Sequence, residues 1–388
     1  MTRPALARHL QGFGTTIFAE MSELATRTGS INLGQGFPDS DGPPELLASA
    51  VAAIGAGHNQ YPPGPGIAAL RVAVSNHQRH WYGFDYDPDT EVLITVGATE
   101  AIASAVMALC EPGDEVVAFE PFYDSYAATI ALAGAIRRPI TMRPPHFGFD
   151  VDALRDAITD NTRMLLFNSP HNPTGHVATE AELAAIAELC VERDLYVVCD
   201  EVYEHLTFGV PHRSLSSYPG IRERCLTIGS AGKTFNCTGW KVGWLCGPAE
   251  LVAAARTVKQ FLTYVGSGPF QYAVADALAL PDEYFHALAS DLQAKRDLLC
   301  GGLRAAGFEV FQSDATYFVT TDVRPLGFDD GFEFCRRLPE MAGVVAIPVN
   351  VFYDDKQVGA PLVRFAFCKR QSVLTQAAER LAAMKRPS

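Results

Sequence analysis

The run Cys-Leu-Thr-Ile-Gly-Ser-Ala-Gly-Lys-Thr-Phe, residues 225–235, decides the fold, because an apolar strand-like stretch ends there in a loop of small residues around Lys233. Most lysines in proteins are solvated surface charges. Lys233 instead follows an apolar run directly, and ligands of open α/β sheets bind at the carboxyl ends of such strands. The sequence therefore predicts a buried, functional lysine beside the end of a strand.

The triplet Gly232-Lys233-Thr234 also invites comparison with a nucleotide-binding P-loop. That motif requires a glycine five positions before its second glycine, and position 227 is Thr. The sequence therefore argues against a nucleotide-binding loop.

Two more strand-like runs end in polar residues. Residues 163–167 lead into a loop that contains Asn172, and residues 195–199 lead into Asp200 and Tyr203. Taken singly, Asp200 could be a helix N-cap, and the Asn-Pro pair at position 172 could be an ordinary turn. Because strand ends of a parallel sheet converge, their joint occurrence with the lysine loop favours one shared site.

These motifs, together with the arginine of Leu-Val-Arg-Phe-Ala-Phe at 362–367, resemble the class I aminotransferases, the fold type I group of pyridoxal-phosphate enzymes. The resemblance runs from Asn32 to Lys369 and is strongest to the branch of kynurenine, glutamine, methionine and N-succinyldiaminopimelate aminotransferases. It implies an α/β fold, with a large, mostly parallel sheet domain covered by helices and a smaller α+β domain. It also implies pyridoxal 5'-phosphate as cofactor and a homodimer with shared active sites.

The periodicity of the chain predicts the same organisation. Strand-like and helix-like runs alternate from about residue 46 to 279, which is typical of a helix-covered parallel sheet. A long amphipathic stretch begins at Asp282 and stops at Gly307, and strand-like runs follow at 309–320 and 362–367. We therefore expect a large cofactor-binding domain at 46–281 and a small domain made of 1–45 and 282–388.

The resemblance implies roles for the residues around the lysine. Lys233 would carry the cofactor as a Schiff base and then move the proton of the substrate Cα, which requires a pKa lowered by burial. Asp200 would pair with the pyridine nitrogen and keep it protonated. Tyr203 and Asn172 would bind the phenolic oxygen of the cofactor. Tyr123 would stack on the ring, although a core aromatic is the alternative reading.

A phosphate site is predicted at a second loop. Gly97, Ala98 and Thr99 lie between a strand-like run and a helix-like run, so their backbone amides would form a helix N-terminus that favours an anion. By resemblance, Ser230 and Lys241 make further phosphate contacts. Many relatives have arginine in place of this lysine, so the charge is kept while bidentate geometry is lost.

One further phosphate contact is implied across the dimer. Tyr61 matches the tyrosine that reaches the phosphate of the other subunit, and a loop tyrosine packed under the neighbouring prolines is the alternative.

Arg364 interrupts an apolar strand-like run, so its charge must pair with an acidic group or bind an anion. The resemblance implies that it binds the substrate α-carboxylate. Gly36 would let the backbone approach the same carboxylate, and a turn glycine is the alternative. The aromatic and apolar candidates for the mouth of the site are Phe13, Ile17, Phe18, Tyr264 and Phe352.

Composition excludes several classes of function. The 388 residues are 48% hydrophobic and carry a net charge of -13, which argues against nucleic acid as a partner. An apolar run long enough for a membrane span and a secretory leader are both missing, so we expect a cytoplasmic protein. Nine cysteines without a Cys-x-x-Cys pair indicate reduced structural thiols, and ten scattered histidines predict no metal.

The predicted activity is transamination with 2-oxoglutarate as acceptor. Whole-chain similarity favours N-succinyl-LL-2,6-diaminopimelate as donor, in lysine biosynthesis, while the aromatic candidates suit methionine or kynurenine equally well. A carbon–sulfur β-lyase is a second alternative, because it uses the same lysine and phosphate site. A ligand-sensing regulator is a third, although such proteins carry an additional DNA-binding domain.

Overall fold

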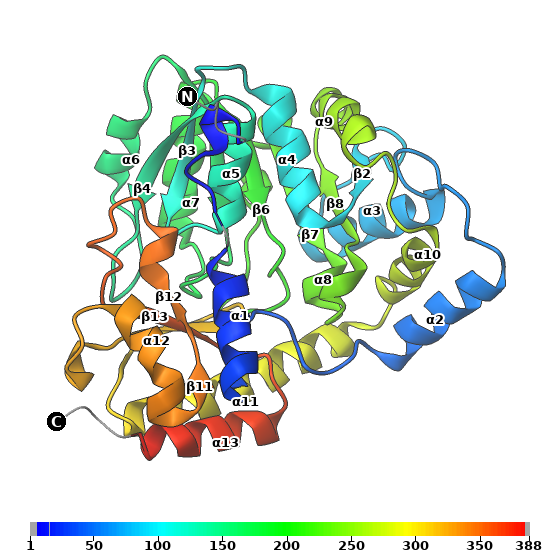
Figure 1. Ribbon diagram of the computed structural model, residues 1–388. Coiled ribbons are helices and arrows are strands. Elements are labelled where there is room, and N and C mark those ends of the chain that lie inside the picture. Colours follow the sequence, from blue (N-terminus) through cyan, green and yellow to red (C-terminus); the bar gives the residue numbers. More distant parts are fainter. Residues whose placement is uncertain (1–5, 15, 385–388) are drawn as a thin grey trace.

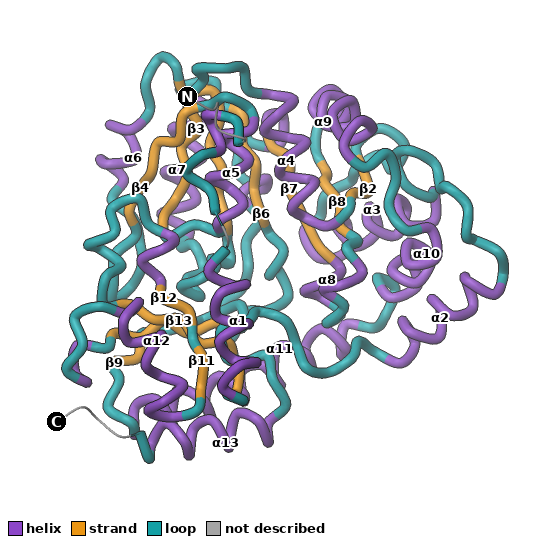
Figure 2. Tube along the Cα trace, viewed as in Figure 1, coloured by secondary structure: helices purple, strands orange, loops and turns teal. Residues whose placement is uncertain are grey.

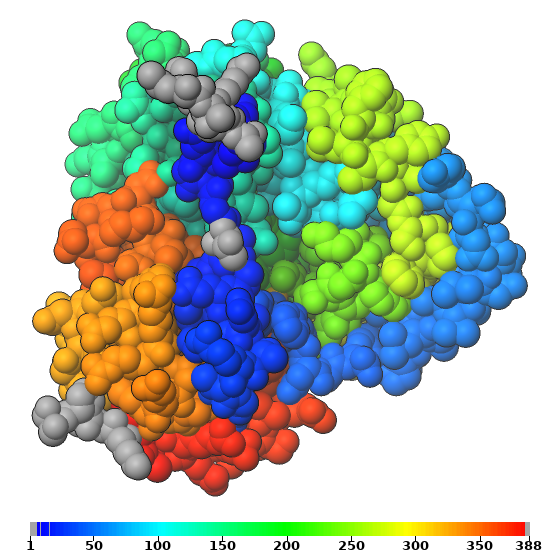
Figure 3. Space-filling model, viewed as in Figure 1, coloured from blue at the N-terminus to red at the C-terminus, as the bar shows by residue number. Residues whose placement is uncertain are grey.

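The computed structural model describes residues 6–14 and 16–384. A large part is built on a seven-stranded sheet, and a smaller part is built on a four-stranded sheet (Figure 1). The N-terminal segment passes from the large part to the small one and lies on the surface along both (Figure 3).

The seven-stranded sheet has the order β2-β8-β7-β6-β5-β3-β4. Its strands are β2 (Val92–Thr95), β3 (Glu115–Glu120), β4 (Ile136–Thr141), β5 (Thr162–Asn168), β6 (Tyr196–Asp200), β7 (Cys225–Ser230) and β8 (Gly243–Cys246). Strand β8 runs antiparallel to both of its neighbours, β2 and β7, and the pairs from β7 to β4 are parallel. Nearly every residue of the central strands is buried, which is expected when helices cover both faces of a parallel sheet (Figure 2).

The helices of the large part follow the strands in the alternating order that the sequence predicts. They are α2 (Pro44–Gly55), α3 (Ala68–Tyr82), α4 (Gly97–Leu109), α5 (Asp124–Leu132), α6 (Val151–Ala157), α7 (Glu180–Glu192), α8 (Ala231–Thr234), α9 (Ala249–Leu262) and α10 (Gly268–Ala277). Helix α4 packs across β6, β7 and β8, so its first turn lies near the carboxyl ends of β6 and β7.

The small part combines both ends of the chain. Its elements are α1 (Ile17–Thr28), β1 (Ile31–Asn32), α11 (Asp282–Ala305), β9 (Glu309–Val310), β10 (Phe318–Asp322), α12 (Gly331–Ala342), β11 (Val344–Val345), β12 (Ile347–Pro348), β13 (Leu362–Ala366) and α13 (Gln371–Ala382). Strands β12, β13, β10 and β9 form an antiparallel sheet, and β1 pairs with β11 in parallel. The N-terminal segment therefore completes the small part.

Most predicted elements are confirmed at nearly the predicted positions, with one correction. The expected strand at 309–320 is wrong as a single element, because Thr316 adopts a left-handed conformation (φ 68°) and the chain turns between β9 and β10. The domain limits at 45/46 and 281/282 stay a prediction. Within the described residues, the helices are all too short or too polar to cross a bilayer.

Candidate active site

A cavity of about 210 Å³ lies where β6, β7 and the start of α4 meet the small part. Nearly all of the predicted site residues line it, although they come from segments far apart in the sequence. They are Phe18, Gly36, Gly97, Ala98, Thr99, Tyr123, Asn172, Asp200, Tyr203, Ser230, Lys233, Lys241 and Arg364. The structure thus brings two lysines, one arginine and one carboxylate around a single space.

One side of the cavity, which we call the helix end, consists of residues 97–99, Ser230 and Lys241. Gly97 begins α4 with φ +71°, and a Cβ there would lie 3.0 Å from the Lys241 ammonium nitrogen. A Cβ on Gly243 would lie 2.7 Å from the Gly97 carbonyl carbon. Close packing against backbone therefore requires glycine at position 243, whereas the left-handed backbone conformation favours glycine at position 97.

The electrostatics of the helix end favour an anion. The first amides of α4 point into the cavity region, and the Lys241 ammonium lies beside them. Burial lowers the pKa of Lys241, while the nearby Glu100 opposes this shift. A phosphate group would supply the negative charge that compensates this burial.

Lys233 lies between the helix end and the opposite side of the cavity. Its Nζ donates a hydrogen bond of 2.9 Å to the Tyr317 hydroxyl, which donates in turn to the Gly36 carbonyl at 2.7 Å. Burial lowers the pKa of Lys233 to about 8, and the Lys241 and Arg364 cations act in the same direction, whereas Asp200 opposes them. The amine is therefore a far better nucleophile and base at neutral pH than a solvated lysine.

Asp200 ends β6 and presents its carboxylate to the cavity. It accepts hydrogen bonds from the Tyr126 hydroxyl at 2.5 Å and from the Val202 amide at 3.3 Å. Burial raises the pKa of Asp200 to about 6, although the Tyr126 bond and the Lys233 charge hold it down. A protonated ring nitrogen beside this carboxylate would keep it ionised.

The opposite side of the cavity, the arginine end, consists of Phe18, Gly36, Asn172 and Arg364. The Arg364 side chain is buried, and it donates to Asn172 Oδ1 at 3.1 Å and to the Gly34 carbonyl at 2.8 Å. Its Nε has no hydrogen-bond partner in the part of the chain that the structure describes.

Burial lowers the pKa of Arg364 to about 10, so the guanidinium stays charged at neutral pH. Because it forms no ion pair with a described carboxylate, its charge is available to an anionic ligand.

Other predicted residues lie elsewhere. Tyr61 is 81% exposed and borders a separate surface depression, where its ring contacts Tyr264 at 5.5 Å. Phe352 is buried and stacks on Phe18 at 5.7 Å, beside the Arg364 guanidinium. Phe13 and Ile17 are not among the residues that line the cavity.

The sequence did not reveal two tyrosines that hold the central groups. Tyr126 lies one helical turn after Tyr123, so the i, i+3 spacing could have pointed to it. Tyr317 immediately precedes β10 and contacts Lys233 across a separation of 84 residues, for which no local signal exists.

Residues 28–381 match the sequence profile of the family described as aminotransferase class I and II. The chain belongs to this family. The enzyme is therefore a pyridoxal-phosphate-dependent aminotransferase, and it has the fold type I architecture of its structural neighbours.

Several relatives are similar to the enzyme over nearly their whole length. A probable N-succinyldiaminopimelate aminotransferase of Mycobacterium tuberculosis is 55% identical, with 98% of both chains covered. The solved structure of the N-succinyldiaminopimelate aminotransferase from that organism superposes with a TM-score of 0.96 and covers 98% of this chain and all of its own. The methionine aminotransferase of Escherichia coli is 41% identical, with 96% of both chains covered.

The residues present fit the cofactor. The helix end offers backbone amides and an ammonium for the phosphate, Asp200 offers a carboxylate for the ring nitrogen, and Lys233 offers an amine of lowered pKa. Tyr123 adds an aromatic ring to the wall of the same cavity.

Proposed function

We propose that the enzyme transfers the amino group of N-succinyl-LL-2,6-diaminopimelate to 2-oxoglutarate, a step of lysine and diaminopimelate biosynthesis. The observation that carries this proposal is the 55% identity, over 98% of both chains, to the M. tuberculosis protein that bears this activity in its name.

We assign the catalytic groups from their positions. When bound, pyridoxal phosphate supplies an electron sink that stabilises negative charge at the substrate Cα. Lys233 holds the cofactor, and its amine of lowered pKa then takes the Cα proton. Asp200 holds a proton on the ring nitrogen through its buried carboxylate, and Tyr126 orients that carboxylate.

Tyr203 and Asn172 are proposed to donate to the phenolic oxygen, and Tyr123 is proposed to pack on the ring face. Residues 97–99, Ser230 and Lys241 would hold the phosphate through amides, a hydroxyl and an ammonium. These contacts fix the cofactor at the helix end while the substrate occupies the arginine end.

The arginine end is proposed to bind the α-carboxylate of the donor and then of the keto acid. The free Arg364 Nε, with no partner among the described residues, supports this assignment, because a carboxylate would satisfy it. Gly36 lacks a side chain where a Cβ would lie 2.4 Å from the Phe318 ring. The backbone there can therefore approach both the aromatic wall and the substrate.

A second candidate donor is methionine or kynurenine. The aromatic pair Phe18 and Phe352 forms an apolar wall next to Arg364, and such a wall suits an uncharged side chain. The 41% identity to the E. coli methionine aminotransferase and the 37% identity to the mouse kynurenine–oxoglutarate transaminase 3 support this alternative.

We also propose that the enzyme is a cytoplasmic homodimer. Exposed apolar side chains gather near Tyr61 at the end of α9, including Phe261, Leu262 and Tyr264. A second copy covering this patch would bring Tyr61 toward the partner's phosphate. All nine cysteines are free and buried, in keeping with a reducing compartment.

The test is a comparison of single donors with the purified, cofactor-loaded enzyme. Absorbance would follow conversion of the cofactor to its amino form, and kcat/KM for the succinylated donor should exceed that for methionine, kynurenine or glutamine by at least about 100-fold. Faster conversion with methionine or kynurenine would replace the proposed donor with the second candidate. Release of pyruvate, ammonia and a thiol from an S-substituted cysteine, added without a keto acid, would instead indicate a β-lyase.

A further inference from the structure

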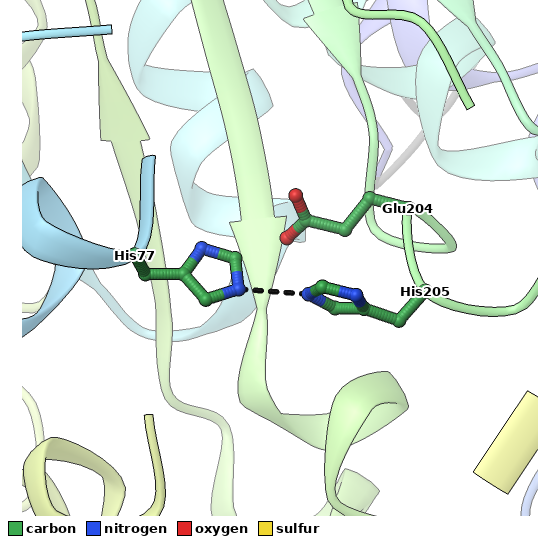
Figure 4. A group of neighbouring side chains, drawn as sticks. All are labelled: His77, Glu204 and His205. Carbon is green, nitrogen blue, oxygen red and sulfur yellow. Dashed lines mark hydrogen bonds between the residues drawn. The ribbon is translucent and has the colours of Figure 1, made fainter. Parts of the chain in front are cut away.

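The turn after β6 presents its side chains to two different places. Asp200 and Tyr203 line the active-site cavity. Glu204 and His205 are not among its lining residues and instead meet His77 of α3 (Figure 4). One ligand atom from each of His77, Glu204 and His205 lies within 4.8 Å of the others. We call these three residues the histidine cluster, and the mechanism above does not use them.

The histidine cluster is buried. His77, Glu204 and His205 are 3%, 5% and 9% exposed. The two Nε2 atoms are 2.7 Å apart, so one ring donates its proton to the lone pair of the other. The Glu204 carboxyl group is directed at the same space (Figure 4).

The cluster contains an acidic group without a matching cation. Within the described residues, Glu204 forms no ion pair with a lysine or arginine, and its carboxyl group accepts a hydrogen bond from the neutral Tyr82 hydroxyl. Burying a carboxylate without a positive partner is costly, so the site favours either a proton or a metal cation at this position.

Aromatic rings separate the cluster from solvent. The Trp81 and Phe285 rings lie 4.8 and 4.5 Å from the His205 ring, measured between centroids. Such an apolar shell limits water access and strengthens the bonds between a cation and its ligands.

We propose that His77 Nε2, His205 Nε2 and a Glu204 carboxylate oxygen bind a divalent transition-metal ion of the zinc type. Two imidazoles and one carboxylate form a donor set that zinc accepts, with water as a fourth ligand. Magnesium and calcium prefer oxygen ligands, so the two imidazoles select against them.

Small side-chain movements would complete the site. Zinc–ligand bonds of about 2.0–2.2 Å in a tetrahedron place neighbouring ligand atoms about 3.3 Å apart. The two imidazoles, at 2.7 Å, must separate slightly, and the carboxylate oxygen must approach from within 4.8 Å. Rotation about side-chain bonds accomplishes both changes, and metal binding then replaces the hydrogen bond between the rings.

The ion has a structural role in this proposal. It joins α3 to the turn after β6; the same turn carries Tyr203 into the active site and directly follows Asp200. Metal binding therefore stabilises the fold and holds this turn in position, without contacting the reacting atoms.

This proposal departs from the expectation of no metal that the sequence supports. Glu204 and His205 are adjacent in the turn after β6, but His77 lies far earlier in the chain, on helix α3. Spacing rules detect ligands that are close in sequence, so they could not detect a cluster that only the fold brings together.

The cofactor-loaded enzyme is first freed of metal with a chelator and dialysed. It is then titrated with zinc chloride in the absence of substrate. Bound zinc per chain is measured by mass spectrometry, and Tm is measured in parallel. We expect one zinc per chain and a Tm increase of roughly 5 °C at about 100 times Kd. His77→Gln and Glu204→Gln should each weaken binding by at least about 100-fold, more than loss of an outer-shell group does.

His80→Gln is the matched control, because His80 lies on the same helix but pairs with Asp282 at the surface. It should bind zinc like the unmodified enzyme. The proposal is overturned if the folded enzyme binds no zinc, or if all three variants bind it equally. Should a cluster variant not fold, cobalt bound to the unmodified enzyme decides, since a tetrahedral site gives intense visible bands and their absence excludes the site.

Discussion

The helix end of the cavity is built from loops of a single sheet, whereas the arginine end is assembled from distant parts of the chain. Ser230 and Lys241 flank the junction between the neighbouring strands β7 and β8, and α4 begins beside them. The arginine end takes Phe18 from α1 and Arg364 from β13, both in the small part.

This difference in construction predicts that the two ends of the cavity have separate functions. The backbone at Gly243 packs so closely on Gly97 that a Cβ would not fit, so the helix end is fixed and can hold a cofactor in one position. The arginine end depends on how the small part is placed against the sheet, so it can adjust to different substrates. Substitutions at the two ends should therefore affect different kinetic quantities.

The largest effect on turnover is expected for Lys233→Ala, because Lys233 acts on the cofactor at the helix end and on the substrate at the arginine end. Loss of the amine removes the covalent attachment of the cofactor and the base for the Cα proton, so kcat should fall by at least about 10⁵-fold. Steady-state assays with the donor and 2-oxoglutarate measure this loss. Lys295→Ala is the control, because Lys295 pairs with Asp291 on α11 and does not line the cavity. Residual turnover of Lys233→Ala above roughly one thousandth would contradict the assigned role.

Arg364→Lys tests the arginine end alone. Lysine keeps the charge but cannot form the bidentate pair, so kcat/KM should fall by about 10²- to 10³-fold for donor and keto acid alike. Cofactor affinity, measured by fluorescence titration, should change by less than about threefold. A large loss of cofactor affinity would show that the two ends are not independent.

Gly97→Ala tests the helix end alone. The added Cβ would lie 3.0 Å from the Lys241 nitrogen, on a backbone with φ +71°, which side chains disfavour. We expect cofactor affinity to fall by roughly 30-fold, with KM for the donor nearly unchanged. Gly239→Ala is the control, since a Cβ there meets nothing within 4 Å. Equal effects of the two substitutions would refute the packing argument.

The same contrast explains what the sequence could predict. Lys233, Asp200 and the 97–99 loop each follow an apolar run, so local patterns placed them at strand ends, and the structure brings them to one cavity. Tyr317 could not be predicted in this way, because its contact with Lys233 depends on how the small part packs against the large sheet.

A pH profile tests the electrostatic coupling between the ends. The Lys233 amine must be neutral to attach the cofactor, and its pKa is lowered from 10.5 to about 8 by burial and by the cations at both ends. Cofactor uptake by the cofactor-free protein should therefore rise about tenfold between pH 7 and pH 9 and then level off. Stopped-flow absorbance measures the rate, and a rise that continues toward pH 10.5 would mean that the lysine is not perturbed.

Tyr317→Phe should have the smallest effect on turnover. It tests whether the two ends of the cavity are linked, because the Tyr317 hydroxyl joins Lys233 to the Gly36 carbonyl at the arginine end. Loss of two ordinary hydrogen bonds should lower kcat by about fivefold. The hydroxyl accepts from the lysine ammonium and so stabilises its charged form. Its removal should therefore lower the pKa of Lys233 and move the midpoint of cofactor uptake to lower pH.

Tyr203→Phe is the comparison variant for measuring the midpoint of cofactor uptake. Tyr203 also lies near Lys233, with its ring centre 5.8 Å from the lysine nitrogen, but no hydrogen bond joins the two side chains. It should lower turnover through the cofactor without the same shift in the uptake midpoint. If Tyr317→Phe lowers kcat but leaves the midpoint in place, the hydroxyl contributes to turnover without setting the pKa of Lys233. If neither quantity changes, the tyrosine only fills space between the two ends, and the hydrogen-bonded link has no functional consequence.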